Sequence, residues 1–162
     1  MNENEIRKIV SDTVEKLKAG REMTLTGART LSRAVMKEAE RIGIKVVVCV
    51  SDAAGNPKLL ESMDGAYIAS VDVAMGKAYT VVALKMSTSK LKALAQPGAE
   101  LYGVQFTNGG RIVVFGGGEP LVGSTGDIIG GLGVSGGSEA QDTALADFGK
   151  SFFETELAEK DN

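Results

Sequence analysis

The residues best suited to binding chemistry lie in two glycine-rich stretches of this 162-residue chain. The first is Asn108-Gly109-Gly110-Arg111, and the second is Gly116-Gly117-Gly118. Successive glycines let backbone amides converge on an anion or lie flat against a planar ligand, and a guanidinium such as that of Arg111 can bind a carboxylate or a phosphate. The structural alternative stays open, because hairpin ends and bulges also use glycines with positive φ angles.

Other common kinds of site are missing from the sequence. Neither glycine-rich stretch contains the GxGxxG or GxxxxGK[ST] pattern of nucleotide-binding loops. Histidine is absent, which removes the commonest metal ligand and the usual general base at neutral pH. The single cysteine, Cys49, lies in an apolar run, so the chain can form neither an internal disulfide nor a multi-cysteine metal site. The sequence therefore predicts no metal site.

Composition narrows the partners that we expect. The net charge of −3, the absence of Trp and the lack of aromatic residues between basic ones argue against nucleic acid. No apolar run approaches the roughly 20 residues that a membrane span needs, and the N-terminus lacks the layout of a secretory signal. These features predict a cytoplasmic protein that binds no membrane.

The elements that must position these residues follow from apolar spacing and capping residues. We expect helices over residues 2–18, 24–42, 67–85, 87–95 and 138–157. We expect strands over Lys45–Ser51, Lys58–Met63, Arg111–Phe115 and Asp127–Ser135. In the last strand, one face carries Gly131 and Gly133, which indicates that a helix, a ligand or another backbone lies against it. This order predicts an α+β fold, an antiparallel sheet with helices on its faces.

The first helix has a separate character. Its apolar residues recur at spacings of three and four and form one stripe, which consists of Ile6, Ile9, Val10, Val14 and Leu17. A helix of this length is marginal alone, so the stripe needs a partner surface. That surface could belong to another protein, to the chain's own domain or to a second copy.

The glycine-rich region also carries a resemblance to a known family. The string TNGGRIVVFGGGEPL, with IIGGLGVSGGSEAQD after it, resembles the signature of the GlcG/HbpS/PduO-C-terminal family. Matching segments upstream are MTLTGARTLSRAVMKEAERIG, VCVSDAAGN, SMDGAYIASVDVAMGKAYT and LAQPGAELYG. The resemblance covers nearly all of residues 23–157. With the separate first helix and the polar end of the chain, this extent predicts three segments: an N-terminal helix and linker over 1–22, the family domain over 23–157 and a polar tail over 158–162.

The resemblance implies a profilin-like, three-layer α/β/α domain with a five-stranded antiparallel sheet. It also implies a homo-oligomer that binds haem or a corrinoid. Some members ligate haem iron with histidine, which this chain lacks, so His-ligated haem is excluded. The remaining candidates for an iron ligand are Met63, Met75, Tyr67 and Cys49, although each also fits a structural role.

Three further polar residues fall at positions that match the family: Asp64, Lys77 and Asp142. Lys77 could form an ion pair beside a pocket with Asp72 or Asp64 upstream, or a structural salt bridge. The adenosyltransferase activity of full-length PduO proteins belongs to a separate domain that this sequence does not contain. No pair of nucleophile and base stands out, so the resemblance favours a binding protein over an enzyme.

The N-terminal stripe resembles the encapsulation peptides that dock cargo to bacterial microcompartment shells. Together these features predict an oligomeric accessory protein that holds a cofactor near its glycine-rich loops, associated with a propanediol-utilisation-like compartment. One alternative is an enzyme of the same fold that modifies a tetrapyrrole or a small metabolite. Another is a structural adaptor that binds no small molecule.

Overall fold

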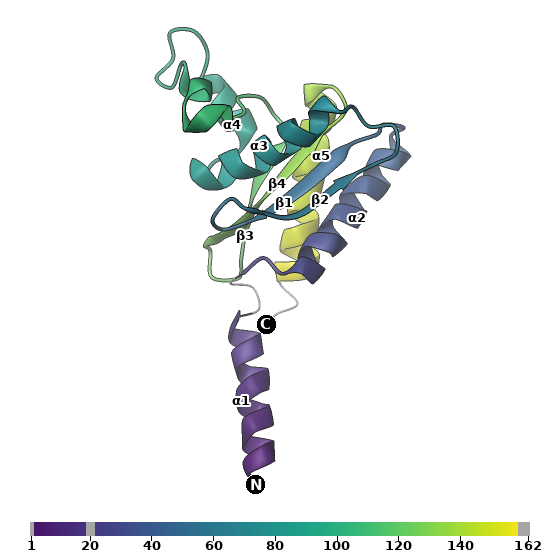
Figure 1. Cartoon of the computed structure of the whole chain (residues 1–162), viewed down its shortest axis with the longest axis vertical. Coiled ribbons are helices and arrows are strands. Elements are labelled where there is room, and N and C mark those ends of the chain that lie inside the picture. The colour runs from purple at the N-terminus through teal and green to yellow at the C-terminus, as the bar shows by residue number, and fades with distance from the viewer. Residues whose placement is uncertain (1, 19–21, 159–162) are drawn as a thin grey trace.

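The computed structural model in Figure 1 describes residues 2–18 and 22–158 and the side chains of 2–11 and 22–156. It contains five α-helices, four strands and three short helices of other types within those residues. Their bounds are α1 Glu3–Lys18, α2 Leu25–Arg41, β1 Val47–Asp52, β2 Pro57–Ser62, α3 Ala69–Ala83, α4 Thr88–Leu94, η1 Val104–Phe106, η2 Asn108–Gly110, β3 Gly118–Val122, β4 Ile128–Ser135, α5 Glu139–Phe152 and η3 Phe153–Ala158.

The strands form one antiparallel sheet in the order β2-β1-β4-β3. Helices α2 and α5 pack on one face and α3 packs on the other, which gives three layers (Figure 1). β1 supplies buried side chains to both faces, as its continuous apolar run predicts: Val48 and Val50 face α2 and α5, whereas Val47 and Cys49 face α3. The predicted α+β class and the three layers are therefore confirmed.

Three helices begin where a capping residue was expected. The Thr24 hydroxyl accepts a hydrogen bond from the Gly27 amide, so Thr24 caps α2. Ser87 caps α4 in the same way. Ser138 and Gln141 form a reciprocal capping box at the start of α5.

The sheet has four strands and not the five that the family resemblance implies. The predicted strand Arg111–Phe115 is wrong, because this segment packs along α3 and does not pair with a strand. The Val113 amide donates to the Thr80 hydroxyl of α3 at 2.9 Å, and a helix side chain thus replaces a ladder partner. On the side of β4 away from β1, the pairing strand is β3, which lies later in the sequence and contains Pro120. Proline is tolerated there because β3 is an edge strand.

The glycine face of β4 accommodates α3. A Cβ atom on Gly133 would overlap with the Ala74 carbonyl oxygen and would lie 2.8 Å from the Ala78 nitrogen. Gly131 meets the Ala78 carbonyl oxygen in the same way. The helix therefore rests directly on the strand backbone, and of the three neighbours that the sequence allowed, the structure shows the helix.

Helix α1 presents the described residues of its apolar stripe to solvent. The described part of the stripe, Ile6, Ile9 and Val10, is 44–56% exposed. Val14 and Leu17 lie on the same helix, but their side chains are outside the described residues. No helix in the described part of the chain is long and apolar enough to cross a membrane.

We predict that Gly133→Ala lowers the free energy of unfolding by at least about 1–3 kcal/mol, the usual cost of overpacking a core. The added methyl group has no room between β4 and α3, because its neighbours are backbone atoms. Denaturant unfolding followed by circular dichroism measures the change. Gly27→Ala is the matched control, since its Cβ would meet only side-chain atoms. Equal stability of Gly133→Ala and the wild type would contradict the close approach.

Candidate functional site

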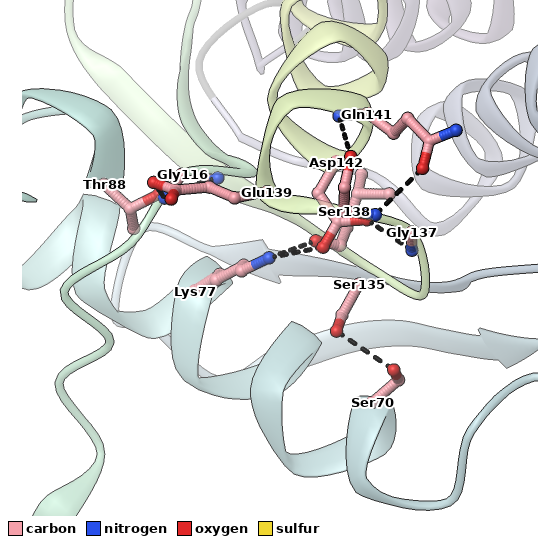
Figure 2. Close-up of polar contacts among 12 residues, drawn as sticks. Ser70, Lys77, Thr88, Gly116, Ser135, Gly137, Ser138, Glu139, Gln141 and Asp142 are labelled. Atoms are coloured by element: carbon pink, nitrogen blue, oxygen red, sulfur yellow. Dashed lines mark hydrogen bonds and ion pairs between the residues drawn. The ribbon is translucent and has the colours of Figure 1, made fainter.

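A buried ion pair connects the helix layers on opposite faces of the sheet. Lys77 of α3 is fully buried, and its Nζ donates to Asp142 Oδ2 of α5 at 2.9 Å and to the Val134 carbonyl at 2.7 Å. The other oxygen of Asp142 accepts from the Gly137 amide at 2.8 Å. Figure 2 shows the Lys77 side chain extended toward Asp142. Burial lowers the pKa of Lys77 in spite of the opposing effect of Asp142.

Asp142 is not one of the two acids that the sequence offered as ion-pair partners of Lys77. Asp72 and Asp64 were candidates because they precede Lys77 in sequence, but neither forms an ion pair with it. Asp64 is exposed in the turn after β2, and Asp72 lies on an exposed part of α3. Asp142 is distant in sequence, and no local spacing points to it. The structural alternative for Lys77, a salt bridge, is what the structure shows.

The second glycine-rich stretch packs around this ion pair. A Cβ on Gly117, whose φ is +109°, would lie within 3 Å of Lys77 Nζ and of the Val134 carbonyl oxygen. The Gly116 amide donates to Glu139 and the Gly118 amide donates to Thr88, each at 2.9 Å. These three glycines are buried among protein atoms.

Further side chains cover the ion pair or lie next to it. The Phe115 ring lies over Lys77, with Nζ 5.0 Å from the ring centroid. Glu139 accepts from Lys92 at 2.6 Å. The hydrogen bond from Gly116, followed by that from Lys92, lowers the pKa of Glu139. Two ion pairs of different burial therefore lie near the start of α5.

Gly110 and Arg111 of the first glycine-rich stretch line a pocket of about 350 Å³ beside α3, whereas Asn108 and Gly109 are not among its lining residues. Asp72, Met75, Gly76 and Tyr79 supply the helix side, at the spacing of one helix face. The remaining lining residues come from loops and the start of β2: Gly55, Pro57, Gly110, Arg111 and Val113. The structure therefore places the two glycine-rich stretches in different environments, and only the first borders this pocket.

Contacts with Tyr79 hold the pocket loop in place. The Arg111 guanidinium lies 3.7 Å from the centroid of the Tyr79 ring, and the Tyr79 hydroxyl donates to Asn108 Oδ1 at 3.1 Å. Asn108, Gly109 and Gly110 all have positive φ angles, so the glycines also meet a structural need. Sequence reasoning missed Tyr79, although its spacing of four from Met75 was a usable signal.

The four candidates for an iron ligand lie in different surroundings. Cys49 is buried, which raises its pKa to about 12 and leaves little thiolate. The Met63 sulfur accepts a hydrogen bond from the Val46 amide, and Tyr67 is 72% exposed away from the pocket lining. Only Met75 of the four borders the pocket. Among the described residues, no group of three or more Cys, Asp and Glu side chains is placed to hold a metal.

We predict that Asp142→Asn lowers the free energy of unfolding by about 3–5 kcal/mol, because it leaves a buried ammonium without its counter-charge. Lys77→Met combined with Asp142→Leu should recover part of that loss, since the charge is then removed as well. Denaturant unfolding measures both variants. Lys92→Met breaks the more exposed pair with Glu139 and should cost less than about 1 kcal/mol. Equal effects of Asp142→Asn and Lys92→Met would refute the difference between the pairs.

Comparison with known proteins supplies an identity for the domain. Residues 23–150 match the family model described as haem degrading protein HbpS-like. A 15.0 kDa protein of Citrobacter freundii, encoded between dhaT and dhaS, is 44% identical over 77% of this chain and 87% of its own length. The corrinoid adenosyltransferase PduO of Salmonella typhimurium is 42% identical over 72% of this chain.

The match to PduO spans only 34% of that protein. Among solved structures, the complex of PduOC with heme superposes with a TM-score of 0.77 at 38% identity, over 80% of this chain and 94% of PduOC. The family match covers most of this chain and agrees with the segments that suggested it. The chain therefore belongs to the HbpS-like family.

Proposed function

We propose that this protein is an accessory protein that binds a planar tetrapyrrole, haem or a corrinoid, in the pocket between α3 and the loop of residues 108–113. The observation that carries the proposal is that Met75, Tyr79 and Arg111 line one pocket. The 38% identity to a protein whose heme complex has been solved supports it. The role is binding, and no side chain of the pocket is assigned a catalytic step.

The residues of the pocket fit such a ligand. A thioether and a phenol are both known axial ligands of haem iron, so Met75 and Tyr79 could supply a bond to the metal without histidine. The Arg111 guanidinium could pair with a carboxylate of the macrocycle. Gly110 has no atom within 4 Å of where a Cβ would lie, so it leaves room for a flat ring to approach the backbone, whereas Gly55 packs against the Tyr79 ring. The metal would supply the ligand's redox chemistry, and the pocket would hold and orient the ring.

We predict that the full chain binds haemin and that Met75→Leu raises the Kd about tenfold or more, because one metal ligand is lost. The same substitution should change the position of the Soret band, which a general weakening of the fold would not do. A titration followed by visible absorbance measures both effects. Parallel titrations with cobalamin decide between haem and corrinoid.

Met36→Leu is the matched control, since Met36 packs against the core on the other face of the sheet. It should leave the affinity unchanged. Arg111→Ala should weaken binding without moving the band, because it removes a carboxylate partner and not a metal ligand. An absence of spectral change with haemin and with cobalamin would sink the tetrapyrrole proposal.

We further propose that the protein forms homo-oligomers and works in the lumen of a bacterial microcompartment. Large apolar side chains remain exposed on the domain, which is typical of assembly surfaces: Tyr67, Ile68, Tyr102 and Phe106. The similarity to PduO supports the compartment, and the exposed stripe of α1 supports a docking role for residues 1–22. Residues 23–157 would then form the ligand-binding domain.

We predict that residues 1–20 direct a fluorescent reporter into isolated microcompartments. Replacing Ile6, Ile9 and Val10 with serine should abolish the enrichment, because shell docking needs an apolar helix face. Lys8→Ser, on the same helix, is the control and should retain the enrichment. A wild-type fusion that stays diffuse in the cell would defeat this proposal.

A further inference from the structure

An apolar groove runs between α2 and α5, on the side of the molecule away from the tetrapyrrole pocket. It has a volume of about 610 Å³. Ala34, Phe148 and Phe152 form its apolar lining, and the two phenyl rings stack with centroids 6.4 Å apart. Its rim is charged, and consists of Lys37, Glu38, Glu40 and Arg41. An apolar floor with a charged rim is the kind of surface that receives one face of an amphipathic helix.

Helix α1 is such an amphipathic helix. Ile6, Ile9 and Val10 lie on one side of it at 44–56% exposure. A helix of this length is marginally stable without a partner, so burial of that stripe would stabilise it. The groove and the stripe are thus two uncovered apolar surfaces of one chain.

The stripe of α1 and the groove lie at equal distances along the chain from the connection between α1 and α2. Ile9 precedes Lys18, the end of α1, by nine residues, and Ala34 follows Leu25, the start of α2, by nine residues. At 1.5 Å per residue, each lies about 13–14 Å from the connection between the helices. If α1 folded back antiparallel to α2, Ile9 would therefore stand beside Ala34.

The connection is long enough for this arrangement. Six residues separate Lys18 from Leu25, and six extended residues span about 20 Å. Packed helices lie about 8–10 Å apart, so the connection reaches. Met23 is buried in the core and fixes the chain at the base of α2.

In the same register, charged residues of α1 would meet the charged rim of the groove. Glu5 of α1 would stand opposite Glu38 and one residue from Lys37, whose ammonium group it could reach. Among the described residues, neither Lys37 nor Glu40 already has an ion-pair partner. Glu38 is already paired with Arg41 at 2.6 Å, so it is not needed for this contact.

We propose that the groove between α2 and α5 is a docking site for α1 of the same chain. The docked helix lies antiparallel to α2 with Ile6, Ile9 and Val10 against Phe148 and Phe152. The same stripe cannot face the groove and an external partner together, so the groove competes with any partner of α1. This contact rests on neither the tetrapyrrole proposal nor the compartment proposal.

A cysteine cross-link tests the proposed register directly. The full chain with Ile9→Cys and Ala34→Cys is oxidised under mild conditions at low protein concentration. The native Cys49 is buried with a pKa of about 12, so it stays out of the reaction. We expect a disulfide within one chain, seen as a monomer by mass spectrometry with the peptides of α1 and α2 linked. The control pair is Ile9→Cys with Lys92→Cys on α4, which should not cross-link.

A second measurement needs no engineered cysteine. Amide hydrogen exchange in residues 3–18 should be slower than in a synthetic peptide of residues 1–20, and Phe148→Ser should remove the difference. Disulfides only between chains would overturn the proposal in favour of docking on a second copy. No preference for the Ala34 pair over the Lys92 pair, or exchange as fast as in the free peptide, would overturn it as well.

Discussion

The ion pair between Lys77 and Asp142 constrains the whole region around the end of β4. A buried ammonium needs a counter-charge and hydrogen-bond acceptors, and here it has the Asp142 carboxylate and the Val134 carbonyl. Gly117 must remain glycine because a side chain would overlap with Lys77 Nζ. Asp142 in turn accepts from the Gly137 amide, so the start of α5 is fixed by the same cluster. One contact thus holds α3, β4 and α5 in a single arrangement.

Helix α3 connects this cluster to the proposed ligand pocket. Ala74 and Ala78 face the sheet, Lys77 points toward α5, and Met75 and Tyr79 face the pocket. Because the helix rests on glycines of β4, it cannot shift toward the sheet without backbone overlap. The side chains that line the pocket therefore lie on a rigid support, which reduces the cost of ordering them when a ligand binds.

Local patterns predicted most of the elements and some of their contacts. These predictions depend only on residues close in sequence, as in the capping at Ser138, the apolar run of β1 and the glycine face of β4. The segment 111–115 was mistaken for a strand because its apolar residues suit a strand as well as a coil packed on a helix. The Thr80 hydroxyl that replaces its ladder partner is a tertiary contact. The partner of Lys77 stayed open for the same reason, since Asp142 is 65 residues away.

In the proposed site, too, some residues were predictable from local sequence and others depend on tertiary contacts. Arg111 and the glycines before it were predicted from composition, and the structure places Gly110 and Arg111 at a pocket. Tyr79 was overlooked, because its spacing of four from Met75 marks a shared helix face but does not tell a pocket wall from a core position. Gly116–Gly118 looked equally suited to a ligand, yet the structure surrounds them with Lys77, Thr88 and Glu139. The two stretches look alike in sequence, and only the three-dimensional fold shows that one borders a pocket and the other is buried.

Pro120 has a consequence for how wide the sheet can grow. It lies in β3, the outermost strand on that side, and it contributes no amide hydrogen. A segment that approached this margin would find an interrupted row of donors, as natural sheets often arrange to prevent unwanted pairing. The opposite margin, β2, has its proline at the first position, Pro57, and keeps the donors of its remaining residues. The two borders of the sheet are therefore unequal, and extension by a further strand is easier beside β2.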